Sequence, residues 1–395
     1  SLIRAGAKNY NGVAVLTSPD SYSAVLAELK TNDGGLSLAT RKRLAAVAFE
    51  LTFTYDRHIS EYFASERGAG VPQATGTDSG ESLELSFTAK SSLRYGENPH
   101  QSARFYQNTD FAGASLADAE ILGGKELSYN NIADLDSALE ELLDFERPFA
   151  CILKHANPCG AAEADTLSRA YELALATDPL SAFGSIIGLN KIVDLAAAEK
   201  LNETQFVECI LAPGYDEDAL ALLKKKKNRR ILALPGISGG RPSAEMYGKF
   251  VRGGLLWQSS DDKVITENEL STATKKQPTA EQIRTLLFAW KIVKHTKSNA
   301  IVIAKDCATV GIGMGQTSRV DASVQAVKRA GGRAEGACLA SDAFFPMPDG
   351  LEVAARAGVS AFIQPGGSKK DPDVIAAADK AGVVMVFTGT RSFRH

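Results

Sequence analysis

Two adjacent residues that can do acid–base chemistry, Lys154 and His155, directly follow the apolar run Phe149–Leu153. The run predicts a strand, and ligands of α/β sheets bind in the crevice beyond the carboxyl ends of strands. A cation beside a histidine disfavours the imidazolium, so it keeps the imidazole neutral and able to accept a proton near neutral pH. The lysine can then stabilise developing negative charge or hold a phosphate. The alternative is a surface Lys and His at a strand end, without a catalytic function.

The residues that follow contain part of a zinc-site pattern. Pro158-Cys159 resembles the start of the PCxxC element of nucleobase-deaminase zinc sites, but the second cysteine position holds Ala162. The companion HxE element is missing as well, because Ala156 and Asn157 follow the histidine. Too few ligands remain for a tetrahedral site. We therefore expect no zinc and no other metal, and a zinc deaminase is the least favoured function.

A second group of segments suits an anionic ligand. Gly311–Arg319 is a Gly-rich loop that opens a predicted helix, so its backbone N–H groups can face an anion. A tight turn without a ligand is the alternative. Arg94–Gln101, Pro365–Lys370 and Arg391 add cations and amide donors. Together these segments favour a phosphorylated small molecule as the ligand.

Composition excludes several function classes. The chain has 395 residues, of which 44% are hydrophobic and 23% charged, as in an ordinary soluble protein with more than one packed unit. Lys+Arg 44 and Asp+Glu 47 give a net charge of −3, which argues against a protein that coats nucleic acid. No apolar run is long enough to span a bilayer, and residues 1–30 lack a signal-peptide pattern. We therefore expect no nucleic-acid partner and no membrane partner.

The five cysteines favour a reducing compartment. They are odd in number and widely spaced, and they form no CxxC pair, which fits a reduced protein better than a disulfide framework. We therefore expect a cytoplasmic location. The first residue is Ser rather than Met, so we also expect that the sequence starts inside a longer gene product.

Strand-like and helical patterns alternate after residue 82. Such alternation predicts a layered α/β architecture with largely parallel strands. Two stretches, Cys151–Ala162 and Val310–Val327, share a β-run, a Gly-containing loop and a helix, which hints at two related subdomains. The predicted strands are Phe149–Leu153, Ile186–Leu189, Ala300–Ala304, Thr309–Ile312, Ala361–Ile363 and Val383–Phe387. The predicted helices are Leu167–Ala176, Thr279–Lys294, Ser323–Ala330, Leu351–Ala357 and Asp373–Ala381.

Residues 1–67 have a different pattern. Ser21–Leu29 and Thr40–Tyr62 predict helices, and Val13–Leu16 predicts a short strand. Residues 68–81 (GAGVPQATGTDSGE) contain almost no large apolar side chain and predict a linker, with a mobile lid as the alternative. Residues 82–395 form the main region, with a subdomain boundary near 250–280. The charge run Lys224–Arg230 predicts a solvated helix end rather than a binding patch.

The chain after the linker contains eight motifs in order: RYGENPHQ, KHANPCGAA, DPLSAFGS, LAPGY, TKSNAIVIAK, GIGMGQTSR, SDAFFP and TGTRSFRH. They closely resemble the motifs of the bifunctional purine-biosynthesis family that carries AICAR formyltransferase and IMP cyclohydrolase activities. Upstream, LIRAGAKNY and the stretch Leu38–Phe63 resemble the last part of the family's cyclohydrolase domain. Most of that domain is absent from this sequence.

The resemblance implies a fold, a reaction and an assembly. The family's formyltransferase region has a cytidine-deaminase-like α/β fold of two related subdomains without the deaminase zinc. Here a partial, mostly helical remnant of the cyclohydrolase domain would precede it. The enzyme transfers the formyl group of its cosubstrate, 10-formyltetrahydrofolate, to the 5-amino group of AICAR, and the cyclohydrolase closes the product FAICAR to IMP. The family acts as a homodimer with sites at the interface, so some site residues are expected to act across chains.

Residue roles follow from the same resemblance. His155 is the expected base, Lys154 is its cationic neighbour, and Asn299 orients the substrate amide and the formyl group. The positions that match AICAR-holding residues of the family are Arg94, Tyr95, Gly184, Glu208, Arg319, Phe344 and Arg391. The positions associated with folate are Val320, Asp349, Ser368 and Lys369.

Lys8 matches the cyclohydrolase lysine of the family. Tyr10 stands where a histidine is common, and the upstream nucleotide-binding loops are absent. We therefore expect little or no cyclohydrolase activity, with Lys8 on a helix surface. A non-catalytic paralogue that binds AICAR is the alternative to a formyltransferase, but the presence of Lys154, His155 and Asn299 argues against it.

Overall fold

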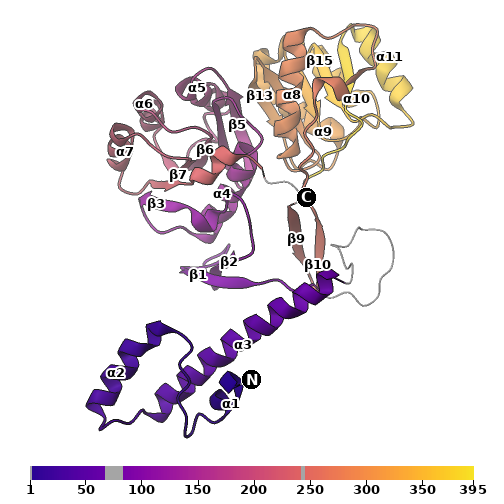
Figure 1. Cartoon of the computed structure of the whole chain (residues 1–395). Helices are drawn as coiled ribbons and strands as arrows, with labels where there is room; N and C mark the ends of the chain where they lie inside the picture. Colours follow the sequence, from indigo (N-terminus) through magenta and orange to yellow (C-terminus); the bar gives the residue numbers. More distant parts are fainter. Residues whose placement is uncertain (1, 67–82, 242–244) are drawn as a thin grey trace. The chain divides into compact units, whose positions relative to one another are not determined.

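The computed structural model describes residues 2–66, 83–241 and 245–395 (Figure 1). The chain divides into two compact units, Ser1–Glu84 and Leu85–His395, and each is described by itself. The predicted linker at residues 68–81 lies outside the described residues. None of the described helices is long and apolar enough to cross a membrane.

The first unit is helical in its described part. It consists of α1 (Leu2–Lys8), a 3₁₀ turn (Pro19–Ser21), α2 (Tyr22–Thr31) and α3 (Leu38–Glu66). The helices predicted at Ser21–Leu29 and Thr40–Tyr62 are thus confirmed. A small core joins α1 to α3, where Ala7, Ala45 and Ala48 are buried.

The strand predicted at Val13–Leu16 is wrong, because this segment is irregular. β-branched side chains favour an extended backbone, but an extended segment needs a partner strand for its hydrogen bonds. No strand lies within residues 2–66 to supply them. Val15 packs instead against the small core.

The second unit contains strands and helices in alternation. Its strands are β1 (Phe87–Leu93), β2 (Ala103–Asn108), β3 (Glu120–Gly123), β4 (Phe149–Lys154), β5 (Asn157–Glu163), β6 (Ser185–Leu189), β7 (Val207–Ala212), β8 (Arg230–Ala233), β9 (Met246–Val251), β10 (Gly254–Ser259), β11 (Ser271–Thr272), β12 (Ile301–Lys305), β13 (Ala308–Gly313), β14 (Cys338–Ser341), β15 (Ala361–Gln364) and β16 (Val384–Phe387). Its α-helices are α4 (Tyr129–Leu142), α5 (Leu167–Thr177), α6 (Leu195–Glu203), α7 (Glu217–Lys224), α8 (Ala280–Lys294), α9 (Arg319–Ala330), α10 (Asp349–Arg356) and α11 (Asp371–Ala381). Short 3₁₀ turns lie at Leu116–Asp118, Pro235–Gly239, Glu267–Glu269 and Gly331–Ala334.

A mixed sheet of twelve strands organises this unit, in the order β11-β16-β15-β14-β12-β13-β5-β4-β6-β7-β8-β3. Two separate ribbons, β1-β2 and β9-β10, lie outside it. The α/β class predicted from the sequence is therefore correct, and each strand and helix predicted in this region has a counterpart in the structure.

The sheet contains the same strand path twice. β4 and β5 form an antiparallel hairpin, β4 also pairs antiparallel with β6, and β6, β7 and β8 run parallel. β12, β13, β14, β15 and β16 repeat this arrangement. We call β4–β8 the first half and β12–β16 the second half; Figure 1 shows them in magenta to red and in orange to yellow. The halves meet where β5 pairs with β13 through Ala162 and Ala308.

Two sequence predictions about the strands are wrong. The strands are not largely parallel, because each half opens with a hairpin and adds an antiparallel neighbour to its first strand. Cys151–Ala162 is also not a strand, loop and helix, since it spans most of the β4-β5 hairpin. His155 and Ala156 take φ values of 54° and 57°, so the chain reverses in a two-residue turn. A turn of that length joins only antiparallel strands.

Helices cover both faces of the sheet, which explains the continuous apolar runs of its strands. Cys151 and Leu153 of β4 belong to one core cluster together with residues of α4 and α8. Ile152 between them points to the other face, where it packs with α5, α6 and α7. In the second half, α9, α10 and α11 pack on the corresponding face.

The charge run Lys224–Arg230 is only partly solvated. It begins at the end of α7, as predicted, and Lys225 is exposed. Lys226 instead donates from Nζ to two carbonyl oxygens at the end of α6, those of Asn202 and Thr204, each at 2.8 Å. Arg229 is 2% exposed. The run therefore holds α6 and α7 together in addition to presenting charge to solvent.

Helix α4 carries a buried carboxyl group beside β4. Glu141 is fully buried, and neither of its carboxyl oxygens accepts a hydrogen bond from the described part of the chain. Burial raises its pKa to about 8, although the nearby Arg394 opposes this shift. Asp144 acts in the same direction as burial, and the Cys151 thiol lies beside the carboxyl group.

The raised pKa predicts a pH-dependent stability. The native state retains the Glu141 proton that the unfolded chain releases above its ordinary pKa of 4.5, so the free energy of unfolding falls as pH rises from 4.5 towards 8. We expect Glu141→Gln to remove about 1–3 kcal/mol of this dependence between pH 6 and 8. Urea unfolding at several pH values measures it. Parallel curves for the wild type and the variant would contradict a carboxyl group that is protonated in the folded protein.

Candidate active site

The β4-β5 turn places His155 at the surface on a constrained backbone. Leu153 below it is fully buried, Lys154 is half-buried, and the imidazole side chain is exposed. Both central turn residues, His155 and Ala156, have positive φ. That conformation costs an L-residue roughly 1–2 kcal/mol, and such strain gathers at functional sites. The candidate base therefore lies on a rigid, two-residue projection.

Three hydrogen bonds fix this turn. The Ala156 N–H donates to the Asp134 carboxylate of α4 at 2.7 Å, and Lys154 Nζ donates to a carbonyl in the loop before β6 at 2.8 Å. The Lys297 N–H donates to Asn157 Oδ1 at 3.2 Å, which connects the turn to the second half. Burial raises the pKa of Asp134, and the amide of Ala156 and the charge of His155 lower it.

Strand pairing collects the predicted residues of both halves at one edge of the sheet. The carboxyl end of β4 lies beside the amino ends of β6, β7 and β8. The antiparallel contact of β5 and β13 puts the amino end of β5 at the same edge as the carboxyl end of β13. The amino end of β12 and the carboxyl ends of β14, β15 and β16 are there as well. We call this the active edge.

The first half contributes two more predicted residues to the active edge. Gly184 precedes β6 with φ 71° and donates its N–H to the Phe206 carbonyl at 2.9 Å. Glu208, at the start of β7, accepts a bond from Arg230 Nη1 at 2.6 Å. The positive φ at position 184 is one that glycine adopts without strain.

Asn299 stands just before β12 and organises the Gly-rich loop after β13. Its Nδ2 donates to the carbonyls of Gln316 and Thr317 at 2.8 and 3.3 Å. The backbones of Asn299 and Gln316 also bond to each other. The Gly-rich loop is therefore attached to the segment that crosses to the His155 turn through Lys297.

Arg319 differs from the exposed phosphate ligand that its sequence context suggests. It is 6% exposed, and its Nη1 is paired with the fully buried Asp342 and with the Ala300 carbonyl. Asp342 also accepts a bond from Ser298 Oγ at 2.5 Å. The guanidinium thus supports the loops of the active edge from below.

The expected folate positions lie where helices of the second half begin. Val320 is in the first turn of α9, Asp349 is the first residue of α10, and Ser368 and Lys369 precede α11. All three helices follow strands that end at the active edge. Their amino termini carry partial positive charge, which favours an anionic ligand.

The remaining expected AICAR ligands come from three loops. Phe344 after β14 is 39% exposed, and the Arg391 guanidinium after β16 lies 4.4 Å from the Phe393 ring centroid. Arg94 and Tyr95 follow β1, where Arg94 Nη2 donates to the Tyr95 hydroxyl at 3.0 Å. Asn130 Nδ2, in the first turn of α4, donates to the Glu97 carbonyl of the same loop at 3.2 Å. Because Asp134 lies one turn further along α4, this loop is anchored close to the His155 turn.

Lys8 lies in the first unit, exposed at the last turn of α1, as expected for a helix-surface lysine. The Arg41 guanidinium donates to the Tyr10 carbonyl, and Lys42 lies over the Tyr10 ring. In the described part of this unit, Lys8 and Tyr10 are the two positions that the sequence analysis related to cyclohydrolase chemistry.

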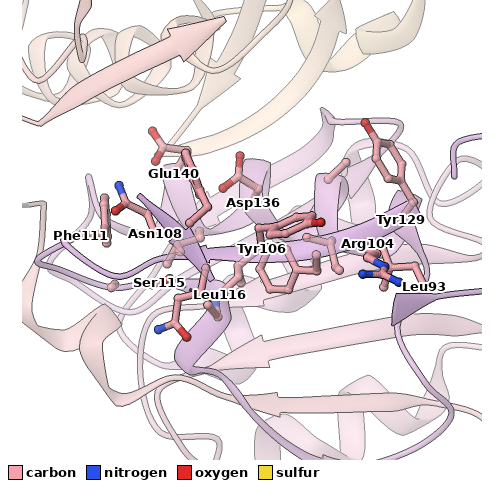
Figure 2. A pocket seen from close by; sticks show the side chains of 18 of the residues that line it. Leu93, Arg104, Tyr106, Asn108, Phe111, Ser115, Leu116, Tyr129, Asp136 and Glu140 are labelled. Carbon is pink, nitrogen blue, oxygen red and sulfur yellow. Dashed lines mark hydrogen bonds between the residues drawn. The ribbon is translucent and has the colours of Figure 1, made fainter. Parts of the chain in front are cut away.

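A cavity of about 420 Å³ lies between the β1-β2 ribbon and α4 (Figure 2). Asp136 and Glu140 line it, together with Tyr106 and Tyr129. None of the predicted site residues is in its lining. Asp134 and Asp136 are two positions apart, about 200° around the helix, so one carboxylate faces the His155 turn and the other faces this cavity.

The partial zinc pattern does not develop into a ligand set in the described part of the chain. The Cys159 thiol is buried and donates to the Ile152 carbonyl. Burial raises its pKa to about 12, so the thiol is protonated. In residues 2–66, 83–241 and 245–395 no three His, Cys, Asp or Glu side chains gather as a metal site.

Comparison with known sequences decides the family. The sequence model described as AICARFT/IMPCHase bienzyme matches residues 6–329. The chain belongs to the AICARFT/IMPCHase bienzyme family. All 395 residues align with the bifunctional purine biosynthesis protein PurH of Thermoanaerobacter sp. (strain X514) at 47% identity. The PurH proteins of Bacillus cereus (strain B4264) and Bacillus anthracis (strain CDC 684 / NRRL 3495) align at 46%. In each case the chain spans 75% of the relative.

The sequence analysis did not identify two carboxylates, Asp134 and Asp342, that fix loops and turns at the active edge. Asp134 lies 22 positions from the turn residue that it contacts, and Asp342 lies 23 positions from Arg319. For Asp342, the local sequence did contain one signal, a charged residue next to an apolar run. Asp342 directly follows a buried strand that ends at Ser341, and a charged residue in such a place needs a buried partner.

Proposed function

We propose that this chain is an AICAR formyltransferase that uses 10-formyltetrahydrofolate as cosubstrate and produces FAICAR. The observation that carries the proposal is the position of the Lys154-His155 turn. The turn lies at the sheet edge where the Asn299 segment and the amino termini of α9, α10 and α11 also gather. A base, a cation, an amide and sites for anionic groups are thus available to one pair of substrates.

The proposed chemistry uses a neutral imidazole. The AICAR amine is a weak nucleophile because its lone pair is delocalised into the imidazole ring and the carboxamide. His155 takes a proton from this nitrogen as it attacks the formyl carbon, and Lys154 stabilises the oxyanion of the tetrahedral intermediate. Collapse of the intermediate breaks the bond between the formyl carbon and the folate nitrogen, which takes up the proton held by His155, so tetrahydrofolate leaves and the formyl group stays on the amine. Asn299 orients the substrate amide and the formyl group.

Binding is divided between the two halves in this proposal. Residues that hold AICAR come from loops of both halves and from the segment after β1, namely Arg94, Tyr95, Gly184, Glu208, Phe344 and Arg391. Arg319 acts from the interior, where its ion pair with Asp342 supports the loops that hold AICAR. Folate lies against the beginnings of α9, α10 and α11, where the residues are Val320, Asp349, Ser368 and Lys369.

The domain assignment is part of the same proposal. Residues 1–67 are the end of a cyclohydrolase domain, and 82–395 are the formyltransferase domain, with two related, cytidine-deaminase-like subdomains. The repeated strand path supports this division. We further propose a cytoplasmic homodimer with sites at the interface, with Lys8 at the position of the family's cyclohydrolase lysine.

A steady-state assay with both substrates tests the function. We expect the purified chain to convert AICAR and 10-formyltetrahydrofolate to FAICAR and tetrahydrofolate, which is followed by the absorbance of tetrahydrofolate. AICAR binding without any transfer would contradict a formyltransferase and identify a non-catalytic nucleotide-binding paralogue instead.

A further inference from the structure

Asp134 connects helix α4 to the turn that carries His155. Its Oδ1 accepts from the Ala156 N–H at 2.7 Å. The carboxylate is half-buried, so its charge is screened less by water than that of a surface group. It also lies close enough to His155 for the two charges to interact. One side chain therefore contacts the backbone of the turn that presents the imidazole.

The second half provides an internal comparison for this contact. Its β12-β13 turn has the same backbone, with φ values of 51° and 57° at Asp306 and Cys307. Lys305 Nζ donates to the carbonyl before β14 at 3.0 Å, as Lys154 does to the carbonyl before β6. The two turns are thus built alike.

The helix contact differs between the two turns. Where α4 supplies the Asp134 carboxylate, α8 supplies Arg284, whose Nε contacts the Cys307 thiol at 3.3 Å. Among the described residues, no carboxylate accepts a bond from the Cys307 amide. A turn of this kind therefore forms without a carboxylate beneath it. The Asp134 carboxylate is therefore not required to form the turn, and it occurs beneath the turn that carries the histidine.

We propose that Asp134 is the positioning residue of His155 in formyl transfer. This inference rests on the proposed function. The carboxylate holds the turn so that the imidazole faces the active edge, and it stabilises the imidazolium that forms when His155 takes the proton from the AICAR amine. Asp134 itself stays ionised throughout, because the proton remains on His155 until it passes to the leaving folate nitrogen.

Three variants separate the hydrogen bond from the charge. Asp134→Asn keeps an oxygen that can accept from the Ala156 N–H but removes the charge, and Asp134→Ala removes both. Asp136→Asn is the matched control: burial raises the pKa of Asp136 to about 6, so at pH 8 this variant removes the same charge from the opposite side of α4. We expect kcat to fall about 10–100-fold in Asp134→Asn and further in Asp134→Ala, with KM for both substrates within about threefold of the wild type. Asp136→Asn should keep the wild-type kcat.

The pH profile supplies a readout that a merely structural role would not change. A neighbouring carboxylate favours the protonated imidazole, so its removal should move the acidic midpoint of the kcat profile of Asp134→Asn to lower pH. Thermal melting confirms that each variant is folded. A wild-type kcat and pH profile in Asp134→Asn, or an equal loss in Asp136→Asn, would overturn the inference.

A measurement that needs no turnover distinguishes this inference from the proposed function. Proton–carbon NMR of histidine-labelled protein follows the His155 ring through a pH titration, with the signal assigned from His155→Gln. We expect the midpoint to fall in Asp134→Asn and to stay unchanged in Asp136→Asn. If the wild type does not transfer formyl groups, the proposed function fails, and this titration alone decides whether Asp134 acts on His155. An unchanged midpoint in Asp134→Asn would overturn that action.

Discussion

His155→Ala is expected to lower kcat for formyl transfer by about 10²–10⁴-fold, which is the usual contribution of a positioned general base. The proton that His155 removes leaves the AICAR amine during attack, so the loss falls on the transition state. KM for AICAR should remain within about threefold, because the groups proposed to hold the nucleotide are elsewhere on the active edge. Steady-state kinetics with both substrates varied, together with AICAR binding by calorimetry, measure the two quantities separately.

The control for this variant is His58→Ala. His58 is exposed on α3 in the first unit, and no formyl-transfer role is proposed for it, so its variant should have wild-type kinetics. Exposure of His155 also means that alanine leaves no cavity, and the melting temperature should not change. Near-wild-type kcat in His155→Ala would remove the imidazole from the mechanism and would leave Lys154 without its proposed partner.

Asp342→Ala is expected to destabilise the second unit by about 3–5 kcal/mol, because it leaves the buried Arg319 guanidinium without its counter-ion. Asp342 is fully buried and is paired with Arg319, which is 6% exposed. It also accepts a bond from Ser298 Oγ, so the same substitution removes a link to the segment before β12. Urea unfolding followed by circular dichroism measures the loss.

Two further variants test this explanation. Asp165→Ala breaks an ion pair with Arg147 in which the aspartate side chain is 94% exposed, and it should cost at most about 1 kcal/mol. The double variant Arg319→Met/Asp342→Leu replaces both buried charges with apolar groups and should recover most of the lost stability. If the double variant is as unstable as Asp342→Ala, the loss comes from packing rather than from an uncompensated charge.

The sequence was most informative where burial on both faces made the strands continuously apolar. Phe149–Leu153 and Ala300–Ala304 were predicted for this reason, and both are central strands. β5 was missed because its sequence, NPCGAAE, contains proline, glycine and alanine, which have weak strand preference. It is a strand because it pairs with β4 and β13 in the middle of the sheet. Tertiary pairing thus outweighed local preference.

The candidate site was predictable in part. Lys154 and His155 are adjacent in the sequence, so their association needed no fold. The meeting of the His155 turn with the Asn299 segment depends on the contact of β5 with β13, which no local pattern encodes. Asp134 was also beyond sequence reasoning, since its partner is the amide of a turn that itself was not predicted.

The seam between β5 and β13 has a consequence for catalysis. Thr309 Oγ1 accepts from the Ala161 N–H at 2.9 Å and lies 2.8 Å from the Thr177 hydroxyl, so polar side chains reinforce a short ladder. The proposed base and the proposed folate pocket belong to opposite sides of this junction. A rotation of a few degrees between the two halves would therefore separate the reacting atoms, even if the structure of each half stayed the same. Simultaneous binding of both substrates would hold the two halves in one orientation. Substitutions at Thr309 that loosen the contact of β5 with β13 would then lower the rate of formyl transfer.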